Sequence, residues 1–181
     1  MTTNILIAIN AAVFILTAVL SQNFINNNVN VLINLGAITQ TSAFYTIFTY
    51  MFLHGGLIHL VMNMFALNSY GKMSEILFKK FYLFLYLISG IISGLAVWFT
   101  TTKPTIGASG AICGIIGANF VYHLLKKTPY IKSIAFDVII LIAISFIPFV
   151  SWIGHLAGFL VGSLVMLLIL NIKKNELPST Q

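Results

Sequence analysis

Charged residues are almost absent from this 181-residue chain, and that feature decides which kinds of structure it can form. They make up 7% of the sequence, whereas about 25% is usual in a soluble domain. Hydrophobic residues make up 59%. A soluble fold of this size would lack the polar residues to cover its surface, and an apolar chain of low charge is not disordered. The composition therefore predicts an all-α polytopic membrane protein.

The excess of basic residues does not point to nucleic acid. The net charge is +6, but all nine basic residues are lysines that lie in small groups between apolar runs. They form no continuous basic face for a phosphate backbone. The single cysteine, Cys113, excludes a disulfide within the chain. We therefore expect the lipid bilayer, and no nucleic acid, as the partner of this chain.

Six apolar runs are candidate membrane spans, because a spanning helix needs ~20 mostly apolar residues. They lie at about 4–20, 57–71, 81–100, 105–125, 133–149 and 152–171. Pro104 and Pro148 fall near boundaries of these runs, where proline is tolerated. The pattern predicts a six-transmembrane-helix bundle that forms one domain over residues 1–181.

The lysines predict how the bundle is oriented. With the N-terminus in the cytosol, the loops at 71–80 and 126–132 and the tail after 171 hold eight lysines, and the opposite loops hold only Lys103. Positive residues accumulate in cytosolic loops. Basic residues that are all lysine, with abundant Asn and Ile, suggest an AT-rich bacterial genome. We expect a multi-pass protein of the bacterial cytoplasmic membrane with both termini in the cytosol.

The first outer loop, residues 21–56, carries no charge. Its first part is rich in asparagine, and its second part has Phe44, Phe48 and Phe52 at the spacing of one helical face. Aromatic residues gather at the membrane interface, so we expect this loop to lie there. The pattern leaves two interpretations open, an ordinary aromatic belt and an element that gates substrate entry.

Polar residues recur near the outer ends of three spans. Ser109 lies about five residues into the fourth, His155 about three into the sixth, and His59, in the second, about three residues past Gly56. Because a helix rises 1.5 Å per residue, the three lie within a few ångströms of one depth. Asn63 shares the face of His59 one turn below. Glycines beside these positions would let the helices approach closely.

These residue types at one depth are typical of nucleophilic catalysis. A serine hydroxyl needs a base at contact distance, and His155 is the candidate base for Ser109. The amide of Asn63, the ring N–H of His59 and the backbone N–H of Ser109 are candidate donors to an oxyanion. All three carboxylates of the chain, Glu75, Asp137 and Glu176, lie toward the cytosolic side in this topology. We therefore expect a Ser–His dyad whose imidazole is oriented by packing.

Three motifs make the whole chain resemble the rhomboid intramembrane serine proteases, in their minimal six-helix bacterial form. They are Gly107-Ala108-Ser109-Gly110, His155-Leu156-Ala157-Gly158, and the series His54, His59 and Asn63 within HGGLIHLVMNM. Each motif alone is weak. Together, in this order and on these spans, they are specific.

The resemblance implies a serine endopeptidase that hydrolyses peptide bonds in or next to transmembrane segments of other membrane proteins, near the outer membrane face. It implies Ser109 as nucleophile, His155 as general base, and His59, Asn63 and the Ser109 backbone as the oxyanion hole. It places His54, Gly107, Gly110 and Gly158 in supporting roles. It implies transmembrane protein substrates, and no metal or cofactor.

The chain departs from the family pattern at a few positions. It has no arginine, whereas the family often carries a Trp-Arg pair in the first outer loop. Cys113 stands where some members place an aromatic residue that stacks on the histidine, and Gly154 stands where alanine is common. The departure at Cys113 leaves open what holds His155.

Three other functions fit parts of the pattern. A catalytically inactive relative would bind membrane proteins, but such relatives typically lack the serine or the histidine. A transporter would use the polar cluster as its substrate site, although no inverted repeat is visible. A haem protein would use His59 and His155 as ligands, and a colourless purified protein would exclude it.

Overall fold

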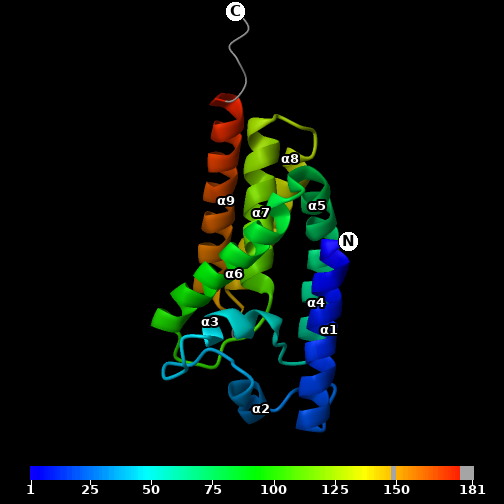
Figure 1. The fold of residues 1–181 in the computed structure, drawn as a ribbon, viewed down its shortest axis with the longest axis vertical. Helices are drawn as coiled ribbons and strands as arrows, with labels where there is room; N and C mark the ends of the chain where they lie inside the picture. Colours follow the sequence, from blue (N-terminus) through cyan, green and yellow to red (C-terminus); the bar gives the residue numbers. More distant parts are fainter. Residues whose placement is uncertain (148–149, 176–181) are drawn as a thin grey trace, which may run out of the picture.

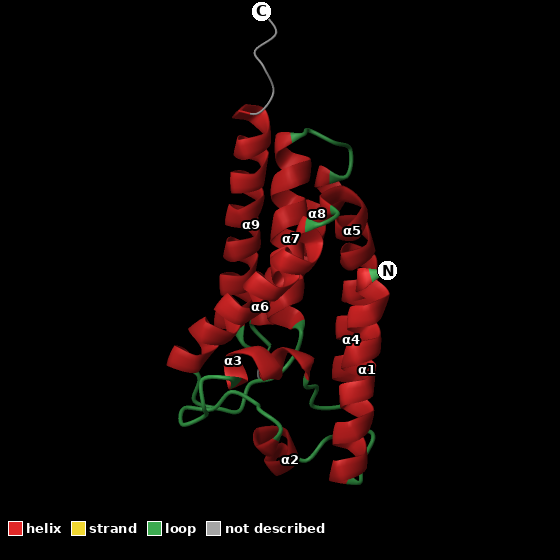
Figure 2. Ribbon diagram, viewed as in Figure 1, coloured by secondary structure: helices red, strands yellow, loops and turns green. Residues whose placement is uncertain are grey.

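The computed structural model describes residues 1–147 and 150–175, and these residues are mainly helical (Figures 1 and 2). The elements are α1 (Thr2–Ser21), α2 (Val29–Asn34), α3 (Thr46–Thr49), the 3₁₀ turn η1 (Tyr50–Phe52), α4 (Leu57–Ala66), the π-helical turn η2 (Leu67–Gly71), α5 (Lys72–Phe78), α6 (Phe81–Thr100), α7 (Ser109–Leu125), α8 (Ile131–Ser145) and α9 (Trp152–Asn175). Over this part of the chain, β-structure is limited to two isolated bridges, Asn26 with Gly56 and Ile38 with Thr105. The all-α prediction is confirmed.

Three of the helices are long and apolar enough to cross a membrane: α1, α6 and residues 152–172 of α9. Helix α7 has 17 residues and α8 has 15. The elements α4, η2 and α5 follow one another without a break from residue 57 to residue 78. The count of six spans and the orientation in the membrane stay predictions.

The second and fourth predicted spans have different ends in the structure. The second continues beyond residue 71 to Phe78, because η2 leads directly into α5. The fourth does not open after Pro104, since α7 begins at Ser109. Before it, Thr105 exchanges two backbone hydrogen bonds with Ile38, of 3.0 and 2.9 Å. Gly107 then has φ +120°, which no helix adopts. The predicted end of the fifth span, at residues 148–149, lies outside the described residues.

Helix α7 lies at the centre of the bundle, packed against α6 and α9 (Figure 1). Most of its residues are buried. Glycines set the close approach of α9, since a β-carbon at Gly158 would meet the carbonyl of Gly110, and one at Gly162 the carbonyl of Gly114. Small residues at such positions let helix backbones approach closely in lipid. The depth of Ser109 and His155 is therefore set by one rigid helix pair.

We expect Gly162→Ala to destabilise the bundle, because the added methyl group meets the backbone of Gly114, which cannot turn aside. Overpacking of this kind typically costs about 1–3 kcal/mol. The measurement is the thermal unfolding midpoint in detergent. Gly55→Ala is the matched control, since its nearest neighbour would lie 3.4 Å from the new β-carbon, an ordinary contact. Equal midpoints for the two variants would contradict this account of the α7–α9 contact.

The segment between α1 and α4 lies at the end of the bundle where α4, α7 and α9 begin (Figure 1). Phe44 and Phe48 are exposed, at 62% and 45%. Phe44 packs edge-on against Trp98 with ring centroids 6.0 Å apart. Tyr50, by contrast, is buried and donates its hydroxyl to the Gly90 carbonyl at 2.8 Å. This segment therefore has an exposed aromatic face and an inner face anchored to α6.

Candidate active site

Ser109 is the first residue of α7 and follows a tight turn at Gly107. The Gly107 N–H donates to the Tyr50 carbonyl at 2.9 Å, and its φ is +120°. A β-carbon on Gly107 would lie 2.8 Å from Nε2 of His59 and 3.9 Å from Oγ of Ser109. Glycine is required here for two reasons: its backbone has a positive φ, and a larger side chain would collide with the nearby imidazole. The Ser109 hydroxyl and the His59 ring thus both lie close to Gly107.

His59 and Asn63 lie on one face of α4, as their spacing predicts. The Gly55 N–H donates to Nδ1 of His59 over 3.4 Å. A nitrogen that accepts carries no proton, so this long bond favours the tautomer with N–H at Nε2, the atom that faces Gly107. Asn63 is buried, and its Nδ2 donates one proton to the His59 carbonyl at 2.9 Å. Its second amide proton is left for another acceptor.

His155 lies in the first turn of α9 and is 8% exposed. Its backbone N–H donates to the Ser151 carbonyl at 3.0 Å. Its Nδ1 lies 2.8 Å from Oγ of Ser145, at the end of α8. The sequence predicts an imidazole oriented by packing and leaves open what holds it; in the structure, a hydroxyl group on the preceding helix contacts the ring.

A cavity of about 700 Å³ brings the four predicted residues together, with Ser109, His155, His59 and Asn63 all in its wall. Residues 100–105 and 150–153, at helix ends and on the connections between helices, line it as well. Its sides include Met62 and Ala66 of α4 and Leu141 and Ile144 of α8. The cavity thus joins the polar cluster to the region between α4 and α8.

Ser109 and His155 share this cavity without a hydrogen bond between their side chains. Among the described residues, the Ser109 side chain makes no hydrogen bond, although the sequence predicts one to His155. Contacts of this kind are often long in an empty active site and tighten when substrate binds. The structure therefore places the two groups in one site, but they are not hydrogen-bonded to each other.

His54 lies in the loop before α4 and is fully buried. Its ring meets that of His59 edge-on, with centroids 5.0 Å apart. Burial lowers the pKa of His54 to about 3, and His59 adds to this effect. His54 is therefore neutral at physiological pH. In this position it packs against His59 and does not line the cavity.

Comparison with known proteins bears directly on this arrangement. A family model described as the rhomboid domain matches residues 41–172, which include the four predicted residues in the cavity wall. The chain belongs to the rhomboid family. The resemblance found in the sequence is confirmed, and with its apolar helices this rhomboid protein is a polytopic membrane protein.

Three relatives illustrate the range of this family. RHOMBOID-like protein 6, mitochondrial, of Arabidopsis thaliana is 35% identical over 69% of this chain. Rhomboid protease GluP of Bacillus subtilis is 30% identical over 65%, and Inactive RHOMBOID-like protein 8 of Arabidopsis is 30% identical over 68%. The chain spans only 43%, 24% and 38% of the lengths of these relatives. One of them is called a protease and another inactive, so membership alone does not decide activity.

The described carboxylates of this rhomboid protein lie away from the cavity. Glu75 accepts the backbone N–H groups of Thr2 and Thr3, at 2.6 and 3.1 Å, and so caps the start of α1. Asp137, on α8, interacts with the Tyr70 hydroxyl. Neither lines the cavity, and Glu176 lies outside the described residues. Residues 1–147 and 150–172 also contain no cluster of three metal-ligating side chains.

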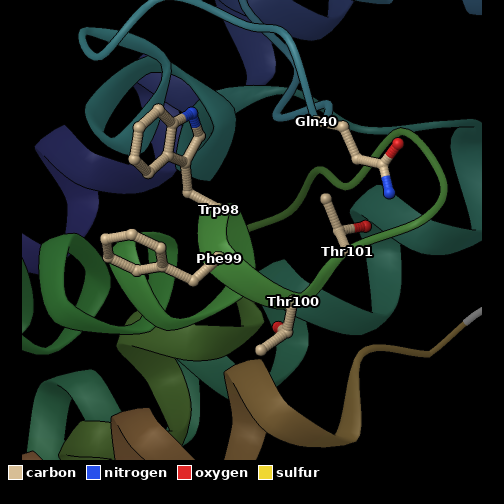
Figure 3. Close-up of a pocket in the computed structure, with 5 residues that line it drawn as sticks. All are labelled: Gln40, Trp98, Phe99, Thr100 and Thr101. Carbon is tan, nitrogen blue, oxygen red and sulfur yellow. The ribbon is translucent and has the colours of Figure 1, made fainter.

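Sequence reasoning missed two serines that support His155. Ser145 contacts its ring, and Ser93 on α6 donates to the carbonyl of the preceding residue, Gly154, at 2.8 Å. Both lie on apolar helices at the depth of the site, and a search for hydroxyls at that depth would have found them. A second, smaller hollow is lined by Gln40, Trp98, Phe99, Thr100 and Thr101 (Figure 3). None of the predicted site residues lines this hollow.

Proposed function

We propose that this chain is a serine endopeptidase of the intramembrane type, which hydrolyses peptide bonds in or next to transmembrane segments of other membrane proteins. The observation that carries the proposal is the single cavity lined by Ser109, His155, His59 and Asn63. Membership of the rhomboid family and the likeness to a relative named as a rhomboid protease support intramembrane protease activity. The retention of both serine and histidine favours an active enzyme over an inactive relative.

In the proposed reaction, Oγ of Ser109 attacks the scissile carbonyl carbon while Nε2 of His155 takes the hydroxyl proton. The imidazolium then gives that proton to the departing amine as the peptide bond breaks. Water next attacks the acyl-enzyme, and His155 accepts one of its protons. The ester bond breaks and Ser109 recovers its hydrogen. No carboxylate takes part in these steps, so the proposed catalytic unit is a dyad.

The negative oxygen formed in each addition needs hydrogen-bond donors around it. The first backbone hydrogen bond of α7 runs from the Ile112 N–H to the Ala108 carbonyl, at 3.0 Å. The Ser109 N–H therefore has no acceptor inside the helix and lies at its positive end. With Nε2–H of His59 and the free amide proton of Asn63, this group forms the proposed oxyanion hole.

The proposed substrate enters from the bilayer between α4 and α8. Met62 of α4 is 59% exposed, and Ile144 of α8 is 37% exposed, while both line the cavity. Apolar side chains of α4 and α8 line the cavity on this side, which suits an apolar segment that leaves the lipid. We place the protein in the bacterial cytoplasmic membrane with both termini in the cytosol, as one six-span domain over residues 1–181 that needs no cofactor.

Labelling with a fluorophosphonate tests this proposal, because the reagent phosphonylates a serine only when a base activates it. We expect the detergent-solubilised protein to be labelled at Ser109, as located by mass spectrometry of its peptides. Ser133→Ala serves as the control, since Ser133 is an exposed serine on α8 away from the cavity, and it should label as fully as the native chain. A folded native protein without label at Ser109 would favour a binding protein or transporter.

A further inference from the structure

Ser145, the last residue of α8, makes two contacts with its hydroxyl oxygen. It donates to the carbonyl of Leu141, one turn earlier, at 2.8 Å. The same oxygen lies 2.8 Å from Nδ1 of His155. Ser145 is half-buried, and His155 is buried. The imidazole of His155, on α9, is therefore in hydrogen-bond contact with the end of α8.

The number of protons decides the direction of the second contact. A hydroxyl group has one proton, and here it is given to the Leu141 carbonyl. A carbonyl cannot donate, so the contact with Leu141 needs the Ser145 hydroxyl as its donor. Both contacts are made at once only when the Ser145 oxygen accepts from a protonated Nδ1 of His155, because the opposite tautomer competes with the Leu141 carbonyl for the single hydroxyl proton and leaves one contact unmade. The neutral ring consequently has its lone pair at Nε2.

We propose that Ser145 is a positioning residue for His155, which holds the imidazole in the tautomer whose Nε2 can accept a proton. This inference rests on the proposed role of His155 as general base. The opposite tautomer would carry N–H at Nε2 and could not deprotonate Ser109. In serine proteases this orienting role usually belongs to a carboxylate. Here a neutral hydroxyl performs it, with the Leu141 carbonyl fixing its direction.

The surroundings of His155 show why the hydroxyl is needed. No ring stacks on this imidazole among the aromatic contacts of the described residues. Cys113, four residues after Ser109, lines the cavity with a small side chain. The described carboxylates Glu75 and Asp137 do not line it. Ser145 is the group that makes a side-chain hydrogen bond to the ring in the described part of the chain.

The pair Ser145→Thr and Ser145→Val tests the inference, because threonine and valine have the same shape and differ in the hydroxyl alone. The first readout is the ¹⁵N spectrum of histidine-labelled protein in detergent, which distinguishes a protonated from a bare ring nitrogen. His155→Ala identifies the His155 signals by their loss. We expect protonated Nδ1 and bare Nε2 in the native chain and in Ser145→Thr. In Ser145→Val we expect a mixture of both tautomers.

The second readout is cleavage of a single-span substrate in liposomes. Loss of a hydrogen bond to a group that becomes charged should lower kcat about 10- to 100-fold in Ser145→Val, with KM unchanged. Ser145→Thr should stay within about 3-fold of the native chain, and so should Ser133→Ala, a hydroxyl deletion on the exposed face of the same helix. If Ser145→Val does not fold, Ser145→Ala takes its place.

The spectrum and the kinetics separate two failures. Fully protonated Nδ1 in Ser145→Val, as in the native chain, or N–H at Nε2 in the native chain, would overturn the role of Ser145. An equal loss of activity in the threonine and valine variants would also overturn it, since only shape would then matter. The expected spectra without any proteolysis by the native chain would support the tautomer assignment and refute the proposed protease function.

Discussion

Replacing Ser109 by alanine is expected to abolish cleavage of single-span membrane proteins by this chain. Removing the nucleophile from a soluble serine protease lowers kcat by a factor on the order of 10⁶. We expect a loss of that order, which leaves no product visible. The measurement is the appearance of product over time in liposomes that contain the enzyme and one substrate from a panel.

Two other hydroxyls in the cavity wall already donate to backbone carbonyls. Tyr50 donates to the Gly90 carbonyl at 2.8 Å, and Ser93 donates to the Gly154 carbonyl at 2.8 Å. Loss of a single hydroxyl oxygen from Ser109 would create no large cavity, so the alanine variant should fold normally. Ser133→Ala, matched in chemistry but distant from the cavity, should cleave at the native rate. Product formation by folded Ser109→Ala within ~10-fold of the native rate would remove Ser109 from the mechanism.

His155→Ala is expected to cause nearly the same loss, because the Ser109 hydroxyl loses its base. Asp137→Asn should stay within ~2-fold of the native rate. Asp137 does not line the cavity, and it interacts with Tyr70. The two variants are compared in the same liposome assay, with folding checked by thermal unfolding in detergent.

The contrast between these variants discriminates a dyad from a triad. A folded Asp137→Asn protein as inactive as His155→Ala would mean that a carboxylate takes part, and the proposed mechanism would be wrong. Activity close to native in His155→Ala would exclude the imidazole as the base. Neither result would follow from misfolding, because the unfolding control separates folding from chemistry.

The candidate site could be predicted from the sequence to a considerable extent. Ser109, His155 and His59 were expected at one depth from counting along apolar runs, and one cavity contains all three. Counting residues along a helix gives the depth of a side chain because a helix has a constant rise per residue. It failed for the start of α7, since the Thr105 bridge to Ile38 and the conformation of Gly107 keep residues 105–108 out of the helix. Ser109 consequently opens the helix and keeps its N–H free.

The sequence alone determined that this chain is an all-α membrane protein of the rhomboid family, because composition, apolar runs and short motifs are local properties of a chain. Tertiary structure decided which groups touch. Ser145 reaches His155 from a different helix, while Ser109 and His155 line one cavity without a hydrogen bond. Such contacts depend on the rotation and spacing of packed helices. Those are set by the close glycine contacts of α7 with α9 and by long-range backbone bonds, which periodicity along the chain does not encode.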